Sequence, residues 1–256
     1  MCYEPNDRPP LPPIAGGAGI ADRADVVLQA ADGNRFDAYT ATTAEADAPG
    51  VVIMPDVRGL HPFYRDLAER FASAGVHATA FDYFGRTDDT GDRSESFPYM
   101  DHVKQTTPDG IAADVAAAIA HVRSDAGGGA RRVFTVGFCF GGRNSFNQAA
   151  RGQGLDGVAG FYGRPQPSDP DDGNAPTRHA REYRCRVLGL FGGADQAIPP
   201  EAVRAFEEAL ADAGVDHELV TYEGAPHSFF DRKATEFEDA CDDAWRRILR
   251  FVGIDA

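Results

Sequence analysis

The sequence predicts an α/β fold in which a mostly parallel β-sheet is covered by helices on both faces. From residue 50 onward, short apolar runs alternate with amphipathic stretches, which is typical of strands joined by helices. The apolar runs are nearly continuous, as in strands that are buried on both sides. A length of 256 residues with 43% hydrophobic content suits one large domain, so we expect a single domain over residues 1–256.

The N-terminal part is expected to contribute an arm and a hairpin. Residues 1–24 are rich in proline and predict an extended arm over the surface. Residues 24–42 hold two strand-like runs on either side of the tetrapeptide ADGN, which predicts a turn between two antiparallel strands.

The rest of the chain alternates between strands and helices. Residues 61–75 show how a helix is recognised: Phe63, Leu67 and Phe71 recur at a spacing of four, and Gly75 provides a stop. Residues 85–108 and 164–184 are polar or rich in Pro, Asp and Gly, and predict surface loops. By these criteria strands are expected at residues 50–55, 76–85, 131–138, 156–163, 186–193 and 216–224, and helices at residues 61–75, 109–129, 140–152, 200–214 and 234–253.

Charge and composition exclude several function classes. A formal net charge of -15 argues against nucleic acid, whose phosphates require clustered Lys and Arg. No run is long and apolar enough to span a bilayer and the N-terminus does not resemble a secretory signal, so we expect no membrane partner and a cytoplasmic location. The expected partner is a small molecule, and the expected assembly a monomer or small homo-oligomer.

Cysteine and glycine usage gives no sign of a cofactor. Cys2, Cys139, Cys185 and Cys241 form no CxxC pair and no Cys/His zinc spacing, so free thiols in a reducing compartment are the simplest account. The glycine clusters outside residues 137–142 have neither GxGxxG nor GK[ST] spacing, so no nucleotide cofactor is expected.

The stretch TVGFCFGGRN, residues 135–144, is the strongest functional signal. A strand that enters a helix through G-x-C-x-G-G makes a sharp turn whose central residue, Cys139, is exposed at the helix N-terminus. The helix dipole there favours a thiolate, which is the nucleophilic species. The alternative is that Cys139 is a small buried hydrophobic residue and the glycines only assist packing. We favour the nucleophile, because a base and an acid follow in the chain.

Those partners are predicted to be His227 and Asp195. Asp195 lies just after the strand expected at residues 186–193, and His227 lies after the strand expected at residues 216–224. Alone, Asp195 reads better as a turn or helix-capping residue. The order nucleophile, acid, histidine at successive carboxyl ends of strands is that of a hydrolytic triad in a doubly wound fold.

These motifs, GFCFGGRN, GGAD and GAPHSF, together with DGVAGFYG and FDYFGR, closely resemble the dienelactone hydrolase family of α/β-hydrolases, from Val26 to Phe251. The resemblance implies the α/β-hydrolase fold and hydrolysis of an ester or lactone through a thioester. It implies Cys139 as nucleophile, His227 as general base and acid, and Asp195 as the residue that orients the imidazole.

The resemblance also implies an oxyanion hole made by the amides of Val57 and Phe140. The family has a glutamate that contacts the thiol just before the first of these positions. Asp56 occupies that place here, one methylene shorter, and the alternative reading of Asp56 is an ordinary turn residue.

Only part of the family's carboxylate-binding pattern is present in this sequence. Arg86 matches a family arginine that receives the substrate carboxylate. The second family arginine is replaced by Asp231, with Arg232 one position later. Arg58 and Arg143 are candidates for compensating charge, although Arg143 is also compatible with a surface position. Because of these departures we expect an ester or lactone that differs from simple dienelactone.

Aromatic side chains near strand ends complete the expected site. Most aromatic residues are expected in the core, while Phe140, Tyr162 and Phe229 are the candidates for the pocket wall. No metal and no cofactor are expected. Within the enzyme class a general carboxylesterase or thioesterase is the alternative, and outside it a noncatalytic ligand binder on the same scaffold, since fold does not fix function.

Overall fold

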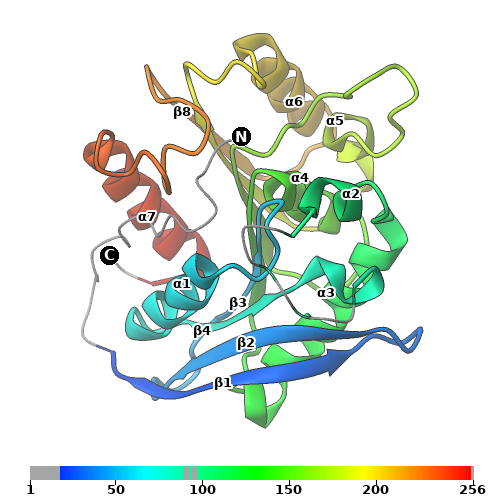
Figure 1. Ribbon diagram of the computed structural model, residues 1–256. Coiled ribbons are helices and arrows are strands. Elements are labelled where there is room, and N and C mark those ends of the chain that lie inside the picture. Colours follow the sequence, from blue (N-terminus) through cyan, green and yellow to red (C-terminus); the bar gives the residue numbers. More distant parts are fainter. Residues whose placement is uncertain (1–17, 89–90, 92, 94–96, 255–256) are drawn as a thin grey trace.

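The computed structural model describes residues 18–88, 91, 93 and 97–254 (Figure 1). Sequence features explain where the main helices begin. For example, α1 begins where the His61 side chain accepts a hydrogen bond from the Phe63 amide, and proline occupies its first turn. The strands are β1 Ile20–Gln29, β2 Arg35–Thr43, β3 Gly50–Met54, β4 His77–Phe81, β5 Val133–Phe138, β6 Gly157–Phe161, β7 Arg186–Gly192 and β8 His217–Tyr222; the longer helices are α1 Pro62–Ser73, α3 Pro108–Arg123, α4 Phe140–Gln148, α6 Pro200–Asp212 and α7 Glu238–Val252.

The eight strands form one sheet with the order β1-β2-β4-β3-β5-β6-β7-β8. β1 and β2 are antiparallel to their neighbours, and the six strands from β4 to β8 run parallel. The expected hairpin and the mostly parallel sheet are therefore confirmed. Because the parallel strands share one direction, their carboxyl ends lie along one edge of the sheet.

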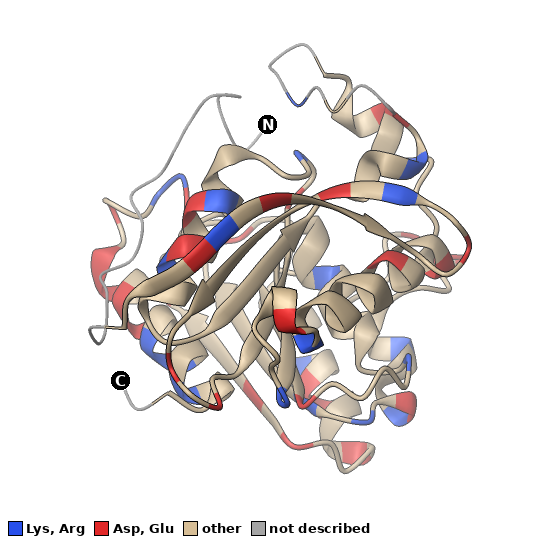
Figure 2. Cartoon of the chain, turned by 90° about the horizontal axis from the view of Figure 1, so that it is seen from below, with Lys and Arg blue, Asp and Glu red and all other residues tan. Residues whose placement is uncertain are grey.

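The sheet is buried on both faces, which explains the continuous apolar runs. Val51 and Ile53 of β3 belong to one core cluster, whereas Val52 and Met54 belong to another. Helices cover the two faces of the twisted sheet, with α1 and α7 seen together in Figure 1. Charged residues of both signs are interspersed over the helices, loops and β1, and the central strands are almost uncharged (Figure 2).

The arm expected over residues 1–24 overlaps the first strand. Ile20–Ala24 belong to β1, where residues such as Asp22 and Arg23 pair with Thr42 and Ala41. Polar residues are tolerated there because β1 is the edge strand and one of its faces is exposed. The rest of the expected arm, residues 1–17, lies outside the described residues.

Short helical segments account for the other differences. The strand expected at residues 76–85 ends at Phe81 and is followed by the 3₁₀ helix η1, Tyr83–Arg86. Two short helices, α2 Tyr99–Val103 and α5 Pro176–His179, lie in segments expected to be loops. One turn of helix is too short to produce a readable apolar period. In the part of the chain that the structure describes, no helix is both long and apolar enough to cross a bilayer.

Candidate active site

Cys139 lies in a sharp turn between β5 and α4. Its φ of 54° and ψ of -110° are in a region that residues other than glycine rarely adopt. The turn is possible because the backbone passes very close to its neighbours: a Cβ on Gly141 would lie 2.0 Å from the carbonyl oxygen of Met54, and one on Gly137 would lie 2.1 Å from that of Gly141. The Cys139 amide donates to the Phe161 carbonyl at 3.0 Å, which joins the turn to β6.

Asp195 and His227 meet beside this turn. Asp195 follows β7, and His227 follows β8. The distance between His227 Nδ1 and Asp195 Oδ2 is 2.6 Å, while Asp195 Oδ1 accepts from the Ala197 amide at 2.8 Å. The Asp195 side chain is 1% exposed, so its charge is screened little by water.

The pKa of His227 is strongly perturbed. Burial alone would lower it, but the hydrogen bond that His227 donates to Asp195, followed by interactions with the Cys139 thiol, outweighs burial and raises the pKa of His227 to about 10. The imidazole therefore carries a proton at neutral pH in the resting state. A positively charged ring thus lies beside the Cys139 side chain.

The three residues open onto one pocket of about 600 Å³. Val57 and Phe140, the expected sources of the oxyanion hole, line the same pocket. Phe140 is the first residue of α4, where an amide has no partner inside its own helix. Within the described residues, no backbone carbonyl accepts from the Val57 amide either. Neither amide therefore has a backbone acceptor among the described residues.

Asp56, the expected thiol-contacting acid, is paired with an arginine. It is fully buried and does not line the pocket. Its carboxylate is bonded to Arg58, with Nε 3.1 Å from each oxygen and Nη2 2.9 Å from Oδ2. This pairing also places Arg58, which is 8% exposed, outside the pocket wall. The short aspartate side chain and an arginine two residues away favour this local pair.

Arg86 is also outside the pocket, contrary to expectation. Its guanidinium is bonded to Asp114, with Nε 2.9 Å from Oδ2 and Nη2 2.8 Å from Oδ1, and Nη1 lies 2.6 Å from Asp32 Oδ2. Asp114 is supplied by α3, and Asp32 by the turn between β1 and β2. These two acids bind the Arg86 guanidinium. They lie on elements that were not expected to contribute to the substrate site.

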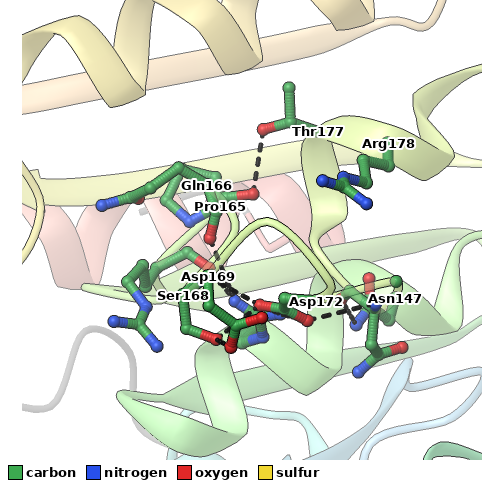
Figure 3. Close-up of polar contacts among 12 residues, drawn as sticks. Asn147, Pro165, Gln166, Ser168, Asp169, Asp172, Thr177 and Arg178 are labelled. Carbon is green, nitrogen blue, oxygen red and sulfur yellow. Dashed lines mark hydrogen bonds and ion pairs between the residues drawn. The ribbon is translucent and has the colours of Figure 1, made fainter.

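Two other arginines line the pocket, and they differ in their partners. Arg143 of α4 binds both carboxylate oxygens of Asp172, at 2.8 and 2.6 Å. Figure 3 shows Asp172 among the neighbouring residues of the loop after β6, where it also accepts from Ser168. Thr177 donates to the Pro165 carbonyl in the same loop. Arg164 lies at the start of this loop and lines the pocket. Its carbonyl accepts from Arg143 Nη1 at 3.5 Å, whereas its guanidinium has no hydrogen bond or ion pair among the described residues.

The expected aromatic wall is partly confirmed. Phe140 and Tyr162 line the pocket, whereas Phe229 does not; its ring packs against that of Tyr162, with centroids 5.8 Å apart. Asp231 and Arg232, at and after the position of the second family arginine, do not line the pocket.

Sequence reasoning missed part of the pocket wall. Met100 and Val103 of the short helix α2 contribute to it, as do Gln196 and Ile198 from the loop after β7. Met100 and Val103 are spaced three apart, which is compatible with one face of a helix and was the signal that could have indicated it.

The chain is similar to known proteins in sequence and in fold. The model of the dienelactone hydrolase family matches residues 36–254. A protein of Escherichia coli O157:H7 provisionally named carboxymethylenebutenolidase is 30% identical over 226 residues, 86% of this chain and 82% of the relative. One of Salmonella typhimurium with the same provisional name is 29% identical over 97% of this chain and 94% of its own length. A solved structure from Klebsiella pneumoniae, provisionally named a dienelactone hydrolase, is 27% identical with a TM-score of 0.76 and covers 90% of this chain and 98% of its own.

Proposed function

The chain belongs to the dienelactone hydrolase family, whose members hydrolyse ester or lactone bonds, and we propose that it does so through a thioester on Cys139. The observation that carries the proposal is the convergence of Cys139, His227 and Asp195 on one pocket, with the His227 pKa raised to about 10. A protonated ring beside a cysteine is an arrangement suited to nucleophilic catalysis.

In the proposed first half-reaction the Cys139 thiolate attacks the carbonyl carbon of the substrate. The carbonyl oxygen becomes an oxyanion that accepts hydrogen bonds from the Val57 and Phe140 amides. When the C–O bond breaks, the electron pair leaves with the alcohol oxygen, which takes the proton from His227. The acyl group remains on sulfur, and the imidazole is now neutral.

In the second half-reaction the neutral imidazole takes a proton from water. The resulting hydroxide attacks the thioester carbon, and the carboxylic acid leaves as sulfur recovers its electron pair. Asp195 holds Nδ1 of the ring throughout, so that Nε2 faces the reacting atoms. The cycle ends with the thiolate and the protonated imidazole of the resting state. No step requires a metal or an organic cofactor.

We also propose that the substrate has an apolar part and an acidic group. Val57, Met100 and Ile198 give the pocket apolar walls. Arg164 is the pocket arginine whose guanidinium has no described partner, whereas Arg143 is neutralised by Asp172. In a protein of net charge -15, an unpaired guanidinium in a cleft is the favoured place for an anionic substituent. Arg164 thus takes the role that the sequence suggested for Arg86.

Replacement of the nucleophile tests the reaction. We expect Cys139→Ala to lower kcat for an aryl ester or a lactone by at least about a thousandfold, with an unchanged melting temperature. Cys185→Ala is the matched control, because burial, with a smaller contribution from Asp156, raises the pKa of Cys185 to about 12 and it lies outside the pocket. Esterase activity that survives in Cys139→Ala would refute the assignment.

A substrate pair tests the anion subsite. We expect Arg164→Gln to raise KM about tenfold for an ester that carries a carboxylate, and to leave KM unchanged for its neutral amide analogue. Equal effects on the two substrates, or none on either, would refute the role of Arg164.

A further inference from the structure

The loop that carries His227 is joined to β6 by a buried contact between two side chains. Tyr162 follows β6 directly, and its Oη lies 2.6 Å from Asp231 Oδ2. Both residues have no exposed surface. The other oxygen of Asp231 accepts from the backbone amide of Arg232. A tyrosine at the end of one strand is thus tied to an acid four residues after the histidine.

Backbone strain is concentrated around the same contact. In the described part of the chain, four residues other than glycine have positive φ, and three of them are Cys139, Tyr162 and Ser228, which follows His227 directly. Such conformations cost free energy and persist where surrounding contacts impose them. The Tyr162 amide donates to the Leu190 carbonyl at 2.7 Å, so its backbone is fixed from β7 as well.

The Tyr162 ring lies against the imidazole. The centroids of Tyr162 and His227 are 4.9 Å apart, with an angle of 52° between the rings. The hydrogen bond to Asp195 fixes Nδ1, but one bond leaves the ring able to tilt about that point. A tyrosine whose own hydroxyl is bonded closes one face of the imidazole and restricts that tilt.

We propose that Tyr162 and Asp231 form a positioning pair that keeps the His227 ring aligned between Asp195 and Cys139. The pair acts through His227 and touches no reacting atom, and its effect on turnover rests on the function proposed above. Asp231 is anchored in turn, since the loop is held to α7 by the Cys241 thiol, which donates to the Phe229 carbonyl at 3.2 Å.

Burial of Asp231 disfavours the charged form of its carboxyl group. Burial raises the pKa of Asp231 well above its ordinary range, and the amide of Arg232 offsets this only in part. A neutral acid can be replaced by an amide of the same shape without loss of charge. Asp231→Asn is therefore the conservative variant that should preserve alignment, and Asp231→Ala is the variant that should not.

The hydroxyl of Tyr162 is tested against a matched tyrosine. Tyr222 also donates to an aspartate, Asp243, at 2.9 Å, and its ring also lies against Phe229, but it lines no part of the pocket. We expect Tyr162→Phe to lower kcat about tenfold at unchanged KM, and Tyr222→Phe to leave both constants unchanged. Equal kinetics for the two variants would overturn the inference.

A spectroscopic readout separates this inference from the proposed reaction. The proton on His227 Nδ1, in a short hydrogen bond to Asp195, should give a far-downfield NMR signal in the wild type. We expect the signal to persist in Tyr222→Phe and Asp231→Asn, and to broaden or vanish in Tyr162→Phe and Asp231→Ala. That pattern supports the pair even if the protein fails to hydrolyse any ester. A signal unchanged in Tyr162→Phe, or one lost in Asp231→Asn as in Asp231→Ala, overturns it.

Discussion

The exposure of Cys139 depends on the two residues that flank it at a distance of two. Gly137 and Gly141 allow backbone atoms to approach closer than any Cβ would permit. The role of these two glycines could be predicted from the sequence, because few other patterns place a cysteine between a strand and a helix with glycines on both sides. The position of the thiol beside an imidazole could not be predicted in this way, since it depends on how β5 and β8 lie in the sheet.

The protonation state of the His227 ring can be predicted from its surroundings. Because its pKa is raised to about 10, the ring should keep its proton between pH 6.5 and about 10, where a free histidine is neutral. His77 and His121 provide internal controls, since burial lowers the pKa of each below 6.5. NMR titration of the imidazole Cε1 protons should show His227 as the last of the three to lose its proton.

Replacement of Asp195 tests the direction in which this residue shifts the His227 pKa. Asp195→Asn removes the first of the interactions that raise the His227 pKa, so the titration midpoint of the ring should move down toward 6.5 or below it. A wild-type His227 that titrates at or below pH 6.5 would contradict the charged resting state.

Among the elements, the hairpin of β1 and β2 illustrates what the sequence left open. Its turn was predicted from ADGN, but nothing local indicated that Asp32 in this turn would reach Arg86. The same arginine bonds to Asp114, whose side chain is 1% exposed, and so joins the hairpin, η1 and α3. Long-range ion pairs of this kind follow from topology and cannot be inferred from spacing along the chain.

Arg86 should therefore contribute to stability and not to catalysis. We expect Arg86→Ala to lower the free energy of unfolding by about 2 kcal/mol, because it leaves the carboxylate of Asp114 buried without its cation. KM for an acid-bearing ester should not change. Urea unfolding and steady-state kinetics measure the two quantities.

The control for Arg86 is an exposed ion pair whose acid, like Asp114, lies on α3. Arg151 lies 2.7 Å from Asp109, whose side chain is 90% exposed, so Arg151→Ala should cost less than about 0.5 kcal/mol. A tenfold rise in KM for Arg86→Ala with unaltered stability would instead show that Arg86 binds the substrate.

Over the whole molecule, the sheet order decides which predictions succeed. Residues at the carboxyl ends of β5, β7 and β8 were expected to meet, and they do, because parallel strands bring those ends to one edge. Arg58 and Arg86 were assigned by position in a motif, and the structure places acidic partners beside both. Met100 and Val103 reach the pocket from a single helical turn, which carries too weak a pattern to be recognised.

Three of the four cysteines of the chain lie among the described residues and offer a direct comparison within one molecule. Cys139 lies at the pocket beside a protonated imidazole. Burial raises the pKa of both Cys185 and Cys241 to about 12, so these thiols should be poor nucleophiles. Selective chemistry at Cys139 is therefore the clearest consequence of the proposed mechanism.

The central claim is tested most directly by rapid quenching of the protein with an activated ester, followed by peptide mass spectrometry. We predict one acyl group on the peptide that contains Cys139, none on Cys185 or Cys241, and loss of the adduct as the substrate is consumed. The adduct should persist longer in His227→Gln, which lacks the base for deacylation. No adduct on Cys139 while the ester is hydrolysed, or an adduct that never clears from the wild type, would contradict the account.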